Sequence, residues 1–310
     1  MVKRIRSDKK TFFGIKANGT VCVGSLLIIV ALVVMTLVIG KPIEGIFANT
    51  QRIVSNNVGW FFILLVNIVL IFILYLGFGK FRKIKIGGKD AKPDFSKSAW
   101  FAMLFSAGMG IGLLFWSVSE PIYHFNSNPF INSDTSSVEA VKSAMGLTFM
   151  HWGLHAWGLY AFVALALAFF TFNKKLPLTI RSVFYPILGD RVYGPIGDII
   201  DTISVIATIF GLATSLGFGV KQINAGLEYV FNVPNDVTIQ VVLIVFITIL
   251  AILSLVMSLD KGIRLLSVIN MRIALFLLVF VFLVGPTVFL LKGIIQNCGF
   301  YASNFLELSF

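Results

Sequence analysis

Charged residues are scarce in this sequence. Only 13% of its 310 residues are charged, whereas 57% are hydrophobic. A soluble domain carries roughly 25% charged residues, so the composition excludes an ordinary soluble domain and indicates a membrane protein. Cysteine is also scarce, because only Cys22 and Cys298 are present. The first lies in a hydrophobic stretch and the second in a late loop, which indicates neither a disulfide framework nor a metal cluster.

Acidic residues are absent from the first four hydrophobic stretches that are long enough to span a membrane. A cationic solute bound there would therefore need aromatic faces rather than a carboxylate. The formal net charge is +11, but the basic residues are concentrated in alternate loops. This distribution argues against a nucleic-acid partner.

The sequence predicts about seven membrane-spanning helices, each of which needs roughly 20 apolar residues. The first lacks a nearby small-residue cleavage site, so we interpret it as a retained helix rather than a signal peptide. The expected spans are 21–40, 58–79, 98–119, 146–171, 195–223, 237–258 and 263–291. The expected fold is an all-α polytopic membrane protein, with the lipid bilayer as its surroundings.

Basic residues alternate along the predicted loops. The tail before the first span and the segment from Lys80 to Lys97 are rich in Lys and Arg, whereas the segment from Glu120 to Ala140 has neither. Cytoplasmic loops are enriched in these residues. We therefore expect a multi-pass protein of the cell (plasma or inner) membrane with a cytoplasmic N-terminus.

Three glycines at alternate positions interrupt the third span, at Gly108, Gly110 and Gly112. Glycine weakens a helix by about 1 kcal/mol relative to alanine, and broken membrane helices occur where the backbone faces a cavity or a solute. Close helix packing through the pair Gly108 and Gly112 explains the same pattern. The stretch alone leaves both interpretations open.

Aromatic residues gather in the fourth span, at Trp152, Trp157 and Tyr160. At about 100° per residue, Trp157 lies about 140° and Tyr160 about 80° from Trp152 around the helix. The three rings share one broad arc and could enclose an alkylated ammonium group by cation–π attraction. An aromatic belt or bundle packing is the alternative.

Two histidines in the same span, His151 and His155, have the spacing of a zinc-binding pair. A hydrolytic site would also need a third ligand and a general base. Neither an acid nor another histidine lies in this predicted span, so packing or hydrogen bonding is the favoured role. An intramembrane metal-dependent enzyme that uses His151 and His155 remains an alternative function.

Charged residues also occur near the ends of later spans. Asp198 and Asp201 lie near the start of the fifth span, and Arg264 and Arg272 near the start of the seventh. We interpret them as an interfacial ion-pair network, with a gate as the alternative.

Together these segments resemble the betaine/carnitine/choline transporter (BCCT) family. The resemblance rests on Gly108-Met109-Gly110-Ile111-Gly112, Phe115-Trp116, Glu120-Pro121, His151-Trp152 with Trp157 and Tyr160, Phe210-Gly211, Ser215-Leu216-Gly217 and Gly285-Pro286-Thr287. It covers nearly the whole chain. It implies two leading helices followed by the first five-helix repeat of an inverted-repeat (LeuT-like) transporter.

This resemblance suggests a division of the chain into three parts. Residues 1–96 would hold the cytoplasmic tail, two leading helices and a basic loop, and residues 97–300 the first repeat. Residues 301–310 would begin a surface helix outside the membrane. Because family members have about twelve helices, the resemblance implies a truncated chain, and a non-transporting fragment is a further alternative function.

The resemblance also implies functional residues. Trp152, Trp157 and Tyr160 would form the cage for a trimethylammonium group, and the backbone of Gly108, Met109, Gly110 and Gly112 would face the solute. Ser106 and Met109 would offer carbonyl oxygens to Na⁺, and Thr208 a hydroxyl. Leu212 stands where two-sodium members have a second threonine, which leaves proton coupling open.

The function implied is a secondary active transporter rather than an enzyme. It would import glycine betaine, choline or carnitine by symport, serve osmoprotection and use Na⁺ or H⁺ as the coupling ion, with no other cofactor. The family tends to form trimers, so a homotrimer is expected.

Overall fold

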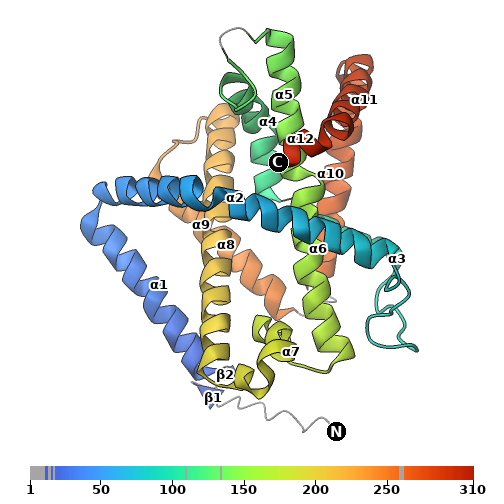
Figure 1. The fold of residues 1–310 in the computed structure, drawn as a ribbon. Helices are drawn as coiled ribbons and strands as arrows, with labels where there is room; N and C mark the ends of the chain where they lie inside the picture. Colours follow the sequence, from blue (N-terminus) through green and yellow to red (C-terminus); the bar gives the residue numbers. More distant parts are fainter. Residues whose placement is uncertain (1–10, 13–14, 17, 109, 133–134, 258–261) are drawn as a thin grey trace. The chain divides into compact units, whose positions relative to one another are not determined.

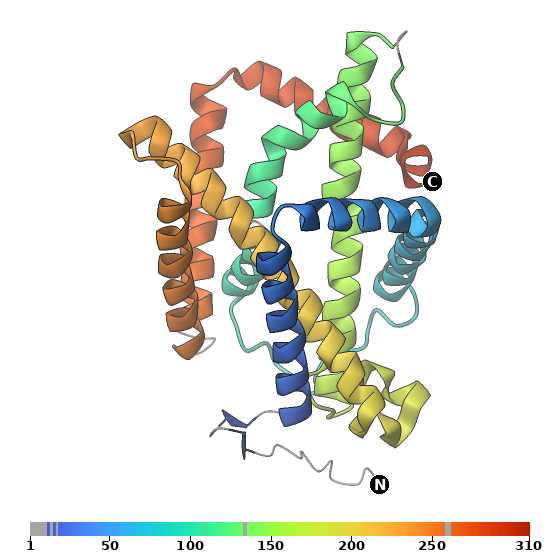
Figure 2. The same cartoon turned by 90° about the vertical axis from the view of Figure 1, so that its left-hand side faces the viewer.

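The computed structural model describes residues 11–12, 15–16, 18–108, 110–132, 135–257 and 262–310. Helices make up almost all of the regular structure in these residues (Figure 1 and Figure 2). A short antiparallel pair of strands, β1 (Thr11–Phe12) and β2 (Ile15–Lys16), precedes them. The all-α fold predicted from composition is confirmed.

The longer helices follow one another with short connections. Their bounds are α1 Gly19–Ile39, α2 Pro42–Phe78, α3 Lys97–Gly108, α4 Ile111–Asn126, α5 Ser137–Trp152, α6 Leu154–Ala168, α8 Pro195–Phe231, α9 Val237–Val256, α10 Arg264–Val284, α11 Thr287–Ser303 and α12 Phe305–Ser309. A π-helical turn, η1 (Phe169–Asn173), continues α6. Three short pieces then precede α8, namely η2 (Ile180–Phe184), α7 (Tyr185–Leu188) and η3 (Gly189–Tyr193).

The helices have the length and apolarity of membrane spans. Six helical segments in the described residues could cross a bilayer, and a seventh follows if α3 and α4 together form one bent span. Apolar side chains stay exposed along them, and in α9 Ser254 is the single buried residue of the helix. Such a helix is stable when lipid rather than water surrounds it. The chain is therefore a multi-pass membrane protein.

Several helix ends differ from the prediction. The expected span 263–291 is wrong at its C-terminal end, because α10 stops at Val284 and α11 begins at Thr287. Pro286 disfavours helical backbone at Gly285 and cannot donate a helical hydrogen bond. The fourth span begins earlier than expected, at Ser137, where Ser136 and Glu139 form a capping box.

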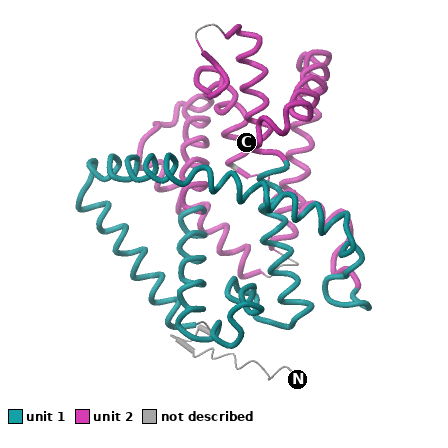
Figure 3. Tube along the Cα trace, in the orientation of Figure 1, with its two compact units in different colours: residues 1–91, 154–211 teal, residues 92–153, 212–310 magenta. Residues whose placement is uncertain are grey.

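The chain divides into two compact units, drawn in different colours in Figure 3. Unit 1 comprises residues 1–91 and 154–211, and unit 2 comprises residues 92–153 and 212–310. The division into residues 1–96, 97–300 and 301–310 is implied by the family resemblance and stays a prediction.

In unit 1, α2 packs against α6. Gly158 lets Leu70 approach closely, since a Cβ at Gly158 would lie 3.2 Å from the Leu70 Cδ1 atom. One turn away Phe72 and Phe162 meet edge to face, with ring centroids 6.2 Å apart. The side chain of Asn173 bonds to the Gly87 N–H and the Lys85 carbonyl, which anchors the basic loop after α2.

In unit 2, α4 packs against α5, α3 against α10, and α11 and α12 against α5. Ser106 Oγ donates to the Ser267 carbonyl at 3.0 Å and so joins α3 to α10. The Phe115 ring of α4 stacks on Phe218 of α8, with centroids 5.2 Å apart. The packing of α4 against α5 places Gly112, at the start of α4, near Trp152, at the end of α5.

Candidate functional site

The glycine stretch interrupts a helix, which is one of the two interpretations that the sequence left open. The helix α3 ends at Gly108, and α4 begins at Ile111 with Gly110 as its N-cap in extended backbone. The two helices are bent by 49° relative to each other. No side chain caps the start of α4, so the first N–H groups of this helix are suited to an anion. Met109 lies outside the described residues.

Trp152 ends α5 and lies beside the glycine stretch. A Cβ at Gly112 would lie 3.6 Å from Trp152 Cη2, which is an ordinary van der Waals distance, so the ring lies close to this part of α4. At its other end, Trp152 Nε1 donates to Glu120 Oε2 at 2.5 Å. Of the two interpretations of the glycines, the interruption is observed at Gly110, whereas close packing through Gly108 and Gly112 stays a prediction.

Glu120 corrects the expectation that the first four spans lack an acid. The predicted span ended at residue 119, but α4 continues through Pro121 to Asn126. Glu120 is therefore a residue of this helix, and it is only 4% exposed. A carboxylate is therefore present beside one of the predicted cage rings.

Trp157 and Tyr160 lie together on α6 in unit 1. Their ring centroids are 5.7 Å apart and the rings are tilted by 39°. Both side chains are accessible, with 41% of Trp157 and 62% of Tyr160 exposed. Trp152, the third ring of the predicted cage, belongs to unit 2. The assembly of all three rings into one cage therefore stays a prediction.

The residues predicted to bind a cation have other contacts. Ser106 accepts a hydrogen bond from Asn270 Nδ2 at 3.2 Å, in addition to its bond to Ser267. The Thr208 hydroxyl donates to the Ser204 carbonyl in its own helix at 2.7 Å. Thr208 also lines a mainly apolar cavity of about 680 Å³ in unit 1, between α1 and α8.

The two histidines have separate partners. His151 Nδ1 lies 2.6 Å from Glu120 Oε1, and His155 Nε2 lies 3.1 Å from Asn67 Oδ1 on α2. The predicted hydrogen-bonding role is confirmed for both. In the part of the chain that the structure describes, no group of three or more His, Cys, Asp or Glu side chains could hold a metal ion.

The acids at the start of α8 form an ion-pair network with Arg181 of η2. Arg181 Nε bonds to Asp201 Oδ2 at 2.6 Å, and Nη2 bonds to Asp198 Oδ1 at 2.8 Å. Burial lowers the pKa of the guanidinium, but the hydrogen bonds and charges of Asp201 and Asp198 outweigh burial and raise this pKa above its ordinary value. The expected ion-pair network is confirmed for Asp198 and Asp201, with Arg181 as its cation. It is not confirmed for Arg264 and Arg272, which take part in none of the ion pairs among the described residues.

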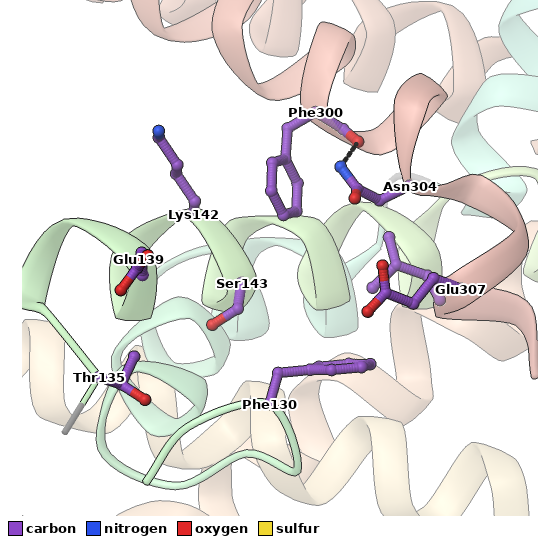
Figure 4. Close-up of a pocket in the computed structure, with 9 residues that line it drawn as sticks. Phe130, Thr135, Glu139, Lys142, Ser143, Phe300, Asn304 and Glu307 are labelled. Carbon is purple, nitrogen blue, oxygen red and sulfur yellow. Dashed lines mark hydrogen bonds between the residues drawn. The ribbon is translucent and has the colours of Figure 1, made fainter. Parts of the chain in front are cut away.

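A further cavity of about 360 Å³ lies in unit 2, at the N-terminal half of α5 (Figure 4). The rings of Phe130 and Phe300 and the hydroxyl of Ser143 border it. Glu139 and Glu307 also line it, each from a different helix. Sequence patterns did not predict this cavity, because its walls come from a loop, α5, α11 and α12.

Comparison with known proteins identifies relatives along nearly the whole chain. A glycine betaine transporter of Acinetobacter baylyi is 43% identical over 293 residues, covering 94% of this chain and 44% of the relative. A glycine betaine/proline/choline transporter of Vibrio parahaemolyticus is 45% identical, over 96% of this chain and 56% of the relative. A glycine betaine transporter of Bacillus subtilis is 45% identical, over 86% and 52%.

The chain spans about half the length of these curated relatives. The family and the relatives are named as transporters, not as enzymes. Residues 20–310 match the family described as BCCT, betaine/carnitine/choline family transporter. The interrupted helix, the aromatic residues and this match together lead to one conclusion: the chain belongs to the BCCT family of transporters.

Proposed function

We propose that this chain forms part of a secondary active transporter that imports a quaternary ammonium solute. Glycine betaine is the first candidate, followed by choline and carnitine. The observation that carries the proposal is the family match over residues 20–310, together with relatives named for glycine betaine. Solute would bind near the middle of the membrane, where the interrupted helix exposes backbone groups.

The proposed cage for the ammonium group consists of Trp152, Trp157 and Tyr160. Support comes from the adjacent, accessible rings of Trp157 and Tyr160. Cation–π attraction to such rings is worth about 2 kcal/mol or more when the cation is desolvated. The backbone at Gly108, Met109, Gly110 and Gly112 would face the remainder of the solute, and the uncapped start of α4 suits its carboxylate.

The coupling ion is Na⁺ or H⁺ in this proposal. Carbonyl groups of Ser106 and Met109 and the hydroxyl of Thr208 are the proposed sodium ligands. The Thr208 hydroxyl donates its hydrogen to the Ser204 carbonyl and keeps oxygen lone pairs that could coordinate an ion. Uptake measured with Na⁺ replaced, at two pH values, distinguishes sodium from proton coupling.

The proposed setting is the cell membrane, with the N-terminus in the cytoplasm and three copies in a homotrimer. Glycine betaine is a zwitterion without net charge, and import of such a solute suits a role in osmoprotection. These assignments rest on the family and on the alternation of basic loops.

Solute binding tests the cage directly. The longest reading frame that contains this sequence is purified in detergent, and glycine betaine binding is titrated by tryptophan fluorescence. Trp157→Leu should weaken binding at least tenfold, because the lost attraction exceeds about 1.4 kcal/mol. Trp60→Leu is the matched control, since Trp60 lies exposed on α2 and should leave the affinity unchanged. The cage would be rejected if Trp157→Leu bound betaine, choline and carnitine each with the same affinity as Trp60→Leu and the parent.

A further inference from the structure

Glu120 is buried in unit 2 and contacts three other side chains. Its Oε2 atom accepts the indole N–H of Trp152, and its Oε1 atom lies 2.6 Å from His151 Nδ1. His124, one turn further along α4, approaches Oε1 with its Nε2 atom at 3.4 Å. All four side chains come from α4 and α5, which pack directly against each other.

These contacts hold the Trp152 ring at more than one point. The N–H edge is fixed by the carboxylate, while Cη2 of the six-membered ring lies near Gly112. The His151 ring lies next to the indole, with centroids 5.4 Å apart. A tryptophan fixed in this way has few rotamers left, so its face is preorganised for a ligand.

The carboxylate also changes the charge distribution of the ring. Hydrogen bonds from a neutral N–H to an anion are stronger than neutral ones and polarise the donor. Polarisation of the indole N–H by Glu120 moves electron density onto the ring, which strengthens its attraction for a cation. The negative charge acts on the solute through the ring and does not require contact with it.

We propose that Glu120 is a positioning residue for solute binding, which fixes the Trp152 ring and makes its face more attractive to the quaternary ammonium group. This inference rests on the proposed function. It assigns the acid a role in selecting a positively charged nitrogen over a neutral centre of the same shape. His151 and His124 hold the carboxylate in place.

The test compares two ligands that differ only at the central atom. Glycine betaine carries a trimethylammonium group, and 3,3-dimethylbutyrate carries a neutral tert-butyl group of the same shape. The affinity for glycine betaine divided by the affinity for 3,3-dimethylbutyrate measures the charge-dependent part of binding. Both are titrated on the same reading frame for the parent, Glu120→Gln, Glu120→Ala and the control Glu228→Gln, whose acid lies exposed on α8 and bonds to Asn235.

The expected result is a ratio that falls roughly three- to tenfold in Glu120→Gln, with little change for 3,3-dimethylbutyrate. Glutamine keeps an acceptor for the indole but removes the charge. Glu120→Ala should weaken both ligands, because the ring loses its anchor as well. Glu228→Gln should behave as the parent.

An unchanged ratio in Glu120→Gln overturns the inference. If that variant does not fold, Trp152→Phe provides the second measurement, because it keeps a ring and leaves Glu120 in place while removing the N–H donor. The ratio should fall by a similar factor, and a ratio equal to that of the parent again overturns the inference. Failure of the parent itself to bind glycine betaine would instead reject the proposed function.

Discussion

Arg181 shows how a single residue can hold a loop onto a helix. Its guanidinium bonds to two acids at the start of α8, and its backbone N–H donates to Asp201 at 3.0 Å. Nη1 also donates to the Val192 carbonyl at 3.3 Å, and Asn18 before α1 donates to Asp198 at 2.7 Å. One cation thus links η2, η3 and α8 within unit 1.

Removal of this cation should destabilise unit 1. Arg181→Ala leaves the largely buried carboxylate of Asp201 without its charged partner, which costs about 3 kcal/mol for a buried pair. We expect a clearly lower melting temperature in detergent, measured by intrinsic fluorescence during heating. Arg191→Ala, at an exposed basic residue of the same segment, should shift the midpoint little. Equal midpoints for the two variants would contradict a structural role for the network.

Glu120 illustrates what residue patterns leave unpredicted. The hydropathy of the third span ends at the Glu-Pro pair, and a proline normally ends a helix or restricts the residue before it. The chain nevertheless stays helical through Pro121. The hydroxyls of Ser117 and Ser119 bond to carbonyls one turn earlier, as side chains do where a membrane helix is irregular. The spacing of Glu120 and His124 by four residues was the available signal.

At the level of elements, the contact between α5 and α11 depends on a glycine. A Cβ at Gly146 would lie 2.6 Å from Phe300 Cε1 and 2.9 Å from Phe300 Cδ1, which is closer than packed atoms allow. The ring of Phe300 therefore packs on the bare backbone of α5. The sequence shows the glycine but not its partner, because the two are far apart along the chain.

Gly146→Ala should loosen this contact. Forcing a methyl group into a packed interface costs about 1–3 kcal/mol, so the melting temperature should fall. Gly293→Ala is the matched control, since a Cβ there would meet no atom within 4 Å and alanine favours a helix. Thermal unfolding of the two variants in the same detergent gives the comparison. A midpoint for Gly146→Ala at or above that of Gly293→Ala would show that α11 does not pack as described.

The helices themselves were largely predictable, because long apolar runs have few alternatives in a membrane. The glycine interruption was only one of two interpretations, since three glycines in such a run weaken the helix locally but also allow close helix packing. Helix ends were less predictable. The polar first half of α2 gave no hydropathy signal, yet Pro42 at its first turn begins one continuous helix to Phe78.

At the level of the whole molecule, the alternating basic loops predict which side of the membrane each connection occupies. Lys89 lies in the basic segment before α3, and Ser127 lies directly after α4. The positive-inside rule places the first in the cytoplasm and the second outside. The helices between them, α3 and α4, would then cross the membrane once as a bent span.

Cysteine labelling of intact cells tests this topology. In a background of Cys22→Ser and Cys298→Ser, a membrane-impermeant maleimide should label Ser127→Cys and leave Lys89→Cys unlabelled. Permeabilised cells provide the control, since both positions are exposed in the structure and should then react. Labelling of Lys89→Cys from outside would place the N-terminal region on the opposite side.

The candidate site was predictable in its parts but not in its connections. Trp157 and Tyr160 could be paired from helical spacing, since three residues bring side chains onto one face. The contact between Trp152 and Glu120 joins residues 32 positions apart. Such a contact depends on how α4 packs against α5, which spacing along one helix does not specify.

The junction between α5 and α6 has one further consequence. Gly153 caps α5, and a Cβ there would lie 2.2 Å from the Phe149 carbonyl oxygen and 3.0 Å from the Tyr301 hydroxyl. In a saturation library of this chain, position 153 should therefore accept almost no replacement, although its neighbour Leu154 is exposed. Natural drift and directed evolution would both have to alter this junction through the surrounding residues, because position 153 itself has no room for a side chain.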